Sequence, residues 1–124
     1  MKTSDLTVYD WFFIEGEAQQ VMPSLIDYVF YGQPVNIAPI PIDEGILEAN
    51  GFEMISVYSN SKRYKLWKGE DEIVWAEKDG TYFLVYISNH NGTWDDIVIE
   101  NVHELQHLLR AAGFDDLAND FKIQ

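Results

Sequence analysis

Residues 54–99 decide the fold, and they read MISVYSNSKRYKLWKGEDEIVWAEKDGTYFLVYISNHNGTWDDIVI. Short runs of β-branched and aromatic residues alternate here with Gly, Asn, Asp and Ser, which is the pattern of strands joined by tight turns. The β-rich runs are Met54–Tyr58, Tyr64–Lys68, Ile73–Glu77, Tyr82–Ser88 and Trp94–Ile99. The stretch therefore predicts a strongly twisted antiparallel meander.

Two dipeptides in this stretch, Asp79-Gly80 and Asn91-Gly92, mark hairpin turns because both favour the positive φ angles of a two-residue loop. Between them, every residue from Tyr82 to Ile87 is apolar. A run that is apolar on both faces is typical of a fully buried strand. We therefore expect this strand in the middle of the sheet with both faces covered.

An amphipathic helix is predicted over residues 102–112, packed across one face of the sheet. Asn101 and Glu104 form a capping box at its start, and Gly113 ends it. The apolar residues of this segment fall on one stripe of the helix: Val102, Leu105, Leu108, Leu109 and Ala112.

A shorter helix is predicted near residues 44–50, with Asp43 as its N-cap. Both helices end on one shared pattern, in which a left-handed glycine lets the next phenylalanine fold back onto a leucine. The two copies are Leu47-Glu-Ala-Asn-Gly51-Phe52 and Leu109-Arg-Ala-Ala-Gly113-Phe114.

Residues 7–35 are rich in Val, Ile, Tyr, Phe and Trp and are broken by turn residues, so two or three antiparallel strands are expected there. The prolines of Asn36–Ile42 exclude a helix, because each biases the preceding residue toward extended geometry. The predicted fold class is therefore α+β. We expect a single domain over residues 1–124, with a possible small β subdomain over 1–36 and a seam at 36–42.

The chain of 124 residues carries 8 Lys and Arg against 21 Asp and Glu, a formal net charge of −13. A field of that sign repels phosphate backbones and anionic lipid, which argues against direct nucleic-acid binding and membrane contact. The absence of cysteine excludes disulfides, thiolate zinc sites and cysteine nucleophiles. Without an apolar leader or membrane-length run, a soluble cytoplasmic protein is expected.

One motif in the sequence matches a known catalytic pattern. His103-Glu104-Leu-Gln-His107 matches the H-E-x-x-H signature of zinc peptidases. In that signature two histidines one helical turn apart bind the metal, and the glutamate polarises its water. A zinc-dependent hydrolase, with His103 and His107 as ligands and Glu104 as general base, is therefore an alternative function.

Three physical points count against that zinc site. Both histidines lie opposite the apolar stripe, so we expect them to face solvent, and Glu104 is already used in the capping box. The third ligand of a catalytic zinc would have to come from His90 or from three aspartates after the helix: Asp115, Asp116 and Asp120. We therefore assign no catalytic, cofactor-binding or metal-ligating residue, and we favour a non-catalytic protein while leaving the enzymatic alternative open.

Two further groups of residues have two interpretations each. The acidic clusters form a solubilising surface or, as a second alternative function, an acidic inhibitor that imitates nucleic acid: Asp43-Glu44, Glu70-Asp71-Glu72, Asp95-Asp96 and Asp115-Asp116. The strand aromatics pack beneath the helices or, if one sheet face is bare, mark a partner or dimer surface: Tyr64, Trp67, Trp75, Tyr82, Tyr86 and Trp94.

Three segments carry a resemblance that spans most of the chain: Leu6-Thr-Val-Tyr-Asp-Trp11, Pro39-Ile-Pro-Ile-Asp-Glu-Gly-Ile-Leu-Glu-Ala-Asn-Gly51-Phe52 and Val102-His-Glu-Leu-Gln106. Together they resemble a family of small hypothetical proteins encoded by gut Bacteroidetes and by their phages or mobile elements. That family has no established biochemical activity. The resemblance implies a genomic setting, and it implies a small curled β-unit before Asn36.

The resemblance also bears on the histidine motif. Relatives are similar around Val102, yet they often lack an acid matching Glu104 and a histidine matching His107, which implies that the full motif is particular to this chain. The function predicted is a non-catalytic protein-interaction module of phage or mobile-element origin. Its protein partner is unknown, and homo-oligomerisation is left open.

Overall fold

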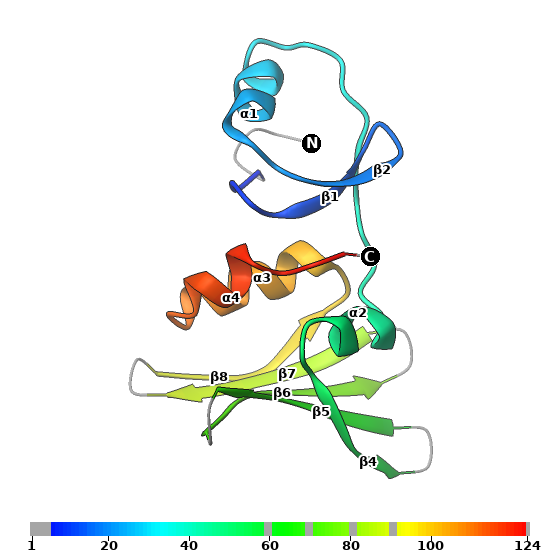
Figure 1. Cartoon of the computed structure of the whole chain (residues 1–124), viewed down its shortest axis with the longest axis vertical. Helices are drawn as coiled ribbons and strands as arrows, with labels where there is room; N and C mark the ends of the chain where they lie inside the picture. The colour runs from blue at the N-terminus through cyan, green and yellow to red at the C-terminus, as the bar shows by residue number, and fades with distance from the viewer. Residues whose placement is uncertain (1–5, 59–60, 69–70, 80–81, 90–91, 124) are drawn as a thin grey trace.

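The structure is a computed structural model that describes residues 6–58, 61–68, 71–79, 82–89 and 92–123. These residues form two open antiparallel sheets and four helices, which confirms the α+β class (Figure 1). The elements in chain order are β1 (Trp11–Ile14), β2 (Glu17–Gln20), α1 (Pro23–Phe30), β3 (Ile37–Pro39), α2 (Glu44–Ala49), β4 (Glu53–Tyr58), β5 (Ser61–Lys68), β6 (Asp71–Asp79), β7 (Tyr82–Asn89), β8 (Gly92–Ile99), α3 (Val102–Ala111) and α4 (Asp115–Asn119).

The larger sheet is the predicted meander, with strand order β4-β5-β6-β7-β8 and antiparallel pairing throughout. At the junction of β6 and β7, Asp79 pairs with Tyr82. The strands therefore reach the two ends of the predicted hairpin. Gly80 itself lies outside the described residues, as does Asn91 of the second predicted turn.

The prediction that β7 is the middle strand and is covered on both faces is wrong. The central strand is β6, and β7 lies between β6 and β8. Phe83, Val85 and Ile87 are buried on one face of β7, whereas Tyr86 on the other face is 41% exposed. A continuous apolar run indicates a strand with neighbours on both sides, but it does not show which faces receive a second layer.

Helices α2, α3 and α4 all lie on one side of this sheet (Figure 1). The whole predicted stripe of α3 is buried in the core between the helix and the sheet: Val102, Leu105, Leu108, Leu109 and Ala112. Burial of a leucine or valine side chain stabilises a fold by about 1.5–3 kcal/mol each, so this stripe accounts for much of the adhesion between α3 and the sheet.

The predicted helix ends are also present. The Asp43 carboxylate accepts a hydrogen bond of 2.8 Å from the Ile46 amide at the start of α2. At the start of α3, the Asn101 amide donates to the Glu104 carboxylate at 2.9 Å. Both helices end in the shared pattern: the Phe52 amide donates to Leu47 O at 3.0 Å, and the Phe114 amide to Leu109 O at 2.8 Å, after glycines with φ of +89° and +91°.

The smaller sheet has the order β2-β1-β3, and its buried residues form a separate hydrophobic cluster. Residues 7–35 contain two antiparallel strands, β1 and β2, as expected, but Pro23–Phe30 forms a helix, α1, that was not expected. Pro23 suits the first turn of a helix, where its missing amide has no partner to lose. Leu25, Ile26 and Val29 then pack on the cluster from one side of the helix, and this packing outweighs the β propensity of the segment.

Segment 36–42 is not helical, as predicted, and it crosses from the small sheet to the main core. It begins as β3 and continues to Ile40 and Ile42, which are both buried in the main cluster. The Val102 amide donates to Ile40 O at 2.9 Å, so the connector is fastened to the start of α3. In the described part of the chain, no helix has the length and apolar character needed to cross a membrane.

One ion-pair cluster attaches α2 to the sheet. The Glu44 carboxylate accepts from Lys78 at 2.7 Å and from Lys62 at 3.0 Å. Hydrogen bonding from Lys78, and then from Lys62, lowers the pKa of Glu44 from 4.5 to about 2. Desolvation raises the pKa of the neighbouring Tyr64 hydroxyl, and the negative charge of Glu44 acts in the same direction.

The substitution Glu44→Gln removes the charge that pairs with both lysines, so it should lower the free energy of unfolding at neutral pH. The loss should be only about 1–2 kcal/mol, because both lysines are partly exposed and solvent screens the ion pairs. The folded-state pKa lies below the unfolded value, so the contribution is complete above about pH 5 and is lost as the pH falls toward 2. Urea denaturation of both proteins across this range tests it. A difference between them that does not shrink on acidification contradicts the assignment.

Candidate functional site

The helix that carries the histidine motif lies between two layers, not on the surface of one. The five-stranded sheet packs on one side of α3, and β1 lies along the other (Figure 1). Phe12 of β1 is fully buried, and its ring stacks on the His103 imidazole with 4.6 Å between centroids and 27° between planes. The expectation that both imidazoles face solvent is therefore wrong for His103, which is half-buried, whereas His107 remains 42% exposed.

Gln106 forms the centre of the contact between β1 and α3. Its side chain is fully buried, yet it is well supplied with hydrogen bonds. The carbonyl oxygen accepts from the Trp11 amide at 2.8 Å, and the amide nitrogen donates to Tyr9 O and to Ala118 O, each at 2.9 Å. A buried amide satisfied in this way fixes two separate backbone segments, residues 9–11 and α4, against α3.

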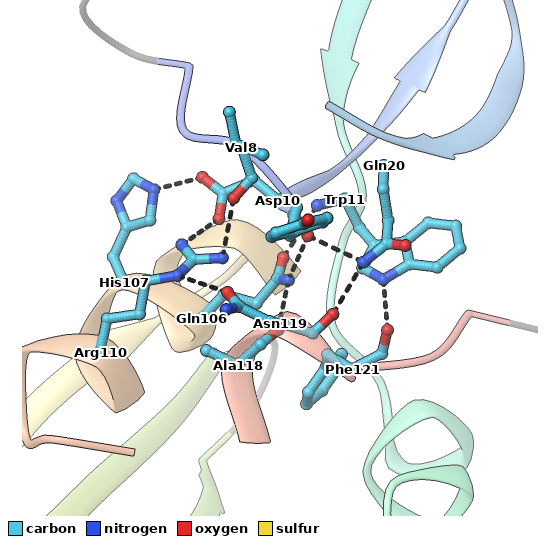
Figure 2. A network of polar contacts seen from close by, with 11 residues as sticks. Val8, Asp10, Trp11, Gln20, Gln106, His107, Arg110, Ala118, Asn119 and Phe121 are labelled. Carbon is cyan, nitrogen blue, oxygen red and sulfur yellow. Dashed lines mark hydrogen bonds and ion pairs between the residues drawn. The ribbon is translucent and has the colours of Figure 1, made fainter. Parts of the chain in front are cut away.

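Asp10 supplies the charge of the same contact. It is fully buried, and its two carboxylate oxygens bind His107 Nε2 and the Arg110 guanidinium (Figure 2). Arg110 donates further to Asn119 Oδ1 at 3.2 Å and to Val8 O at 3.3 Å. We call Asp10, Gln106, His107 and Arg110 the β1–α3 clamp.

The backbone at Tyr9 is held in an unusual conformation beside the clamp. Its φ of +74° is rare for a bulky residue. The Tyr9 carbonyl accepts from Gln106 Nε2 and also from Gln20 Nε2, the latter at 3.1 Å. The Trp11 indole N–H donates to the Phe121 carbonyl, which attaches the C-terminal tail to the same point (Figure 2). The clamp therefore joins the small sheet, α3 and the tail.

The three residues of the H-E-x-x-H motif thus all make structural contacts. His107 Nε2 faces Asp10, His103 packs under Phe12, and Glu104 holds the Asn101 amide. The two imidazoles are neighbours, with 5.7 Å between ring centroids, but they meet at an edge-to-face angle.

The proposed third ligands lie elsewhere. Asp115 and Asp116 are exposed in the first turn of α4, and Asp120 is exposed just after that helix. His90 falls outside the described residues. Within the described ranges, no group of three or more His, Asp or Glu side chains is placed to hold a metal ion.

Sequence reasoning did not single out Asp10, Gln106 or Arg110. A signal was present at each end of the contact. Asp10 is an acid inside an otherwise apolar run, and α3 places Gln106 and Arg110 one turn apart on the same side. A lone acid in such a run indicates a buried partner, but that partner, Arg110, lies 100 residues away along the chain.

The second candidate site is the face of the large sheet away from the helices. Strand pairing aligns Lys65, Trp75 and Tyr86 in one row across β5, β6 and β7. A second row aligns Arg63, Glu77, Leu84 and Val98 across β5 to β8. We call these residues, with Trp67, the open face.

The strand aromatics are divided between the two sides. Tyr64 is fully buried, and Trp94 packs against the main core. Trp67 and Tyr86 are each 41% exposed. The predicted surplus of aromatics therefore exists in part, and it gathers on the open face.

Cations accompany the rings of the open face. The Lys65 ammonium lies 4.0 Å from the Trp75 ring centroid and 5.5 Å from that of Trp67. The Arg63 guanidinium lies 5.9 Å from the Trp75 centroid and 3.5 Å from the Glu77 carboxylate. This face is therefore nearly balanced in charge, in contrast to the strongly acidic chain as a whole.

Comparison of the chain with protein-family models, with curated proteins and with solved structures gives no significant match.

Removal of the Asp10 carboxylate should break the β1–α3 clamp. Asp10→Ala leaves the Arg110 guanidinium and the His107 imidazole without their shared acceptor, and we expect a loss of about 2–4 kcal/mol in the free energy of unfolding. Asp27→Ala removes an exposed aspartate and should cost less than about 0.5 kcal/mol. Denaturant unfolding of both variants measures the difference, and equal costs would show that the clamp does not stabilise the fold.

The clamp also predicts the response to metal. Because Asp10 already occupies His107 Nε2, addition of zinc should not raise the melting temperature, and a chelator should not lower it. Metal analysis of the purified protein combined with thermal melting provides the test. Stoichiometric zinc together with a melting temperature that falls in chelator would favour the hydrolase alternative instead.

Proposed function

We propose that this protein is a non-catalytic protein-interaction module that binds its partner through the open face. One observation carries the proposal: the helices cover a single side of the five-stranded sheet (Figure 1), and no described element forms a second layer over the aromatic and aliphatic side chains of the other side. A sheet normally buries an apolar face against another element.

The residues of the open face are those that partner surfaces favour. Protein interfaces are enriched in Trp, Tyr and Arg, and a few such residues supply most of the binding energy. Trp67, Trp75, Tyr86 and Arg63 give this composition. A hydrogen-bonded sheet holds them in fixed rows, so little conformational entropy is lost when a partner binds.

The biological setting is a further part of the proposal. The resemblance to small proteins of gut Bacteroidetes phages and mobile elements supports a role in the cytoplasm of a bacterium that carries such an element. The strongly acidic remainder of the surface keeps the molecule from binding nucleic acid directly, and it favours a protein partner with a basic surface.

A capture experiment with matched variants tests the proposal. Tagged wild-type protein is compared with two double variants. One is Trp67→Ser/Tyr86→Ser on the open face. The other is Phe30→Ser/Tyr31→Ser at the end of α1, where Phe30 is 70% exposed and Tyr31 is 76% exposed. Quantitative mass spectrometry of a bacterial lysate should show at least about a tenfold loss of captured partner for the first pair.

The α1 pair should capture as much partner as the wild type does. Both pairs replace large exposed hydrophobic residues, so a general loss of stickiness would affect them equally. Loss confined to the α1 pair, or equal loss in both, would contradict the open face as the contact surface.

A further inference from the structure

We infer that the open face takes an arginine side chain from a basic segment of the partner, in a hollow beside Tyr86. This inference rests on the proposed function, because it names the chemistry of the partner that the same surface would bind. Four observations support it, from the shape of the hollow, the strand pairing, the ring contacts and the net charge.

The hollow is a shallow depression of about 190 Å³ over the middle of the open face. Its walls combine aromatic rings with carboxylates, a composition suited to an organic cation. Five side chains of the open face line it, namely Arg63, Trp75, Glu77, Leu84 and Tyr86, and Asp96 of β8 lines it beside them.

A β-bulge brings Asp96 to this position. Val85 pairs with Ile97 and Ile87 pairs with Trp94, so Tyr86 lies opposite two residues of β8 instead of one. Asp96 has a φ of +51°, a left-handed conformation that is uncommon for a residue with a side chain. Bulges redirect side chains, and this one adds a carboxylate to the wall beside the Tyr86 ring.

The protein's own side chains show that aromatic rings of this face bind cations. The Lys65 ammonium lies 4.0 Å from the centre of the Trp75 ring, which is cation–π geometry. Tyr86 is the next residue in that row and is 41% exposed. An incoming guanidinium could stack on the Tyr86 ring and donate paired hydrogen bonds to the Asp96 carboxylate, which is the geometry that arginine favours.

The net charge selects among possible occupants. With a net charge of −13, the molecule repels a second copy of itself and any acidic segment. The same charge attracts a basic segment and raises the rate at which that segment meets the protein. Arg63 does not reverse this preference locally, because its guanidinium lies 3.5 Å from Glu77. A basic segment with an arginine anchor is therefore the occupant that fits both the hollow and the field around it.

The test uses the full chain and defined peptides. A short peptide of alternating glycine and arginine is titrated into ¹⁵N-labelled protein, and a peptide in which citrulline replaces arginine serves as the uncharged control. The amide shifts of Trp75, Tyr86 and Asp96 should move most with the arginine peptide. The citrulline peptide should bind at least about fivefold more weakly.

Two matched variants locate the site. Asp96→Asn should raise the dissociation constant of the arginine peptide about fivefold or more, and it should fold normally because asparagine tolerates the left-handed backbone. Asp95→Asn removes the same charge from the neighbouring residue, which does not line the hollow, and should change the constant less than about twofold. Tyr86→Phe should bind as the wild type does, whereas Tyr86→Leu should bind more weakly.

Three results would overturn the inference: shifts spread over the acidic surface, equal losses in the two aspartate variants, or equal binding of the citrulline peptide. If one of them is found while lysate capture still depends on Trp67 and Tyr86, the inference fails and the proposed function stands. If capture is independent of these residues but the arginine peptide binds in the hollow, the contact surface for the partner lies elsewhere and the proposed function fails.

Discussion

The buried carboxylate of Asp10 is the constraint on which the arrangement of the molecule depends. A charged group fully removed from water is costly unless donors surround it, and here His107 and Arg110 of α3 provide them. The small sheet can therefore dock in only one orientation, with Asp10 over one turn of α3. Gln106 adds a satisfied amide beside the ion pair, and a misplaced dock would leave both groups unpaired.

This constraint gives α3 two different contact sides, of which the one toward β1 is only partly buried. Toward the large sheet the helix presents its apolar stripe. The hydrophobic contact there has no directional requirement, so it does not by itself fix the orientation of the helix. Toward β1 it presents Gln106, His107 and Arg110, whose hydrogen bonds have fixed geometry. The H-E-x-x-H spacing arises naturally on such a helix, since residues one turn apart face the same neighbour. His103 and His107 both face the small sheet for that reason, and they meet Phe12 and Asp10 there.

Helices α2, α3 and α4 gather on one side of the large sheet and leave the open face on the other side (Figure 1). The small sheet docks on α3 and so adds a third layer on the side that is already covered (Figure 1). Nothing in the described residues forms a layer over the row of Lys65, Trp75 and Tyr86. The near balance of charge in those rows also sets them apart from the strongly acidic composition of the chain as a whole.

The sequence by itself determined the local features. The meander of β4 to β8, the apolar stripe of α3, the Asp43 cap and the paired Gly-Phe helix ends all follow from residues close together in the chain, whose propensities and spacing act over one or two turns. Local spacing also identified the H-E-x-x-H motif, but spacing alone could not show which residues contact the imidazoles of His103 and His107. The tertiary structure decided the partners of Asp10, the helical state of Pro23–Phe30, and which face of β7 is covered. Each of these depends on contacts between residues far apart in sequence, which no local pattern records.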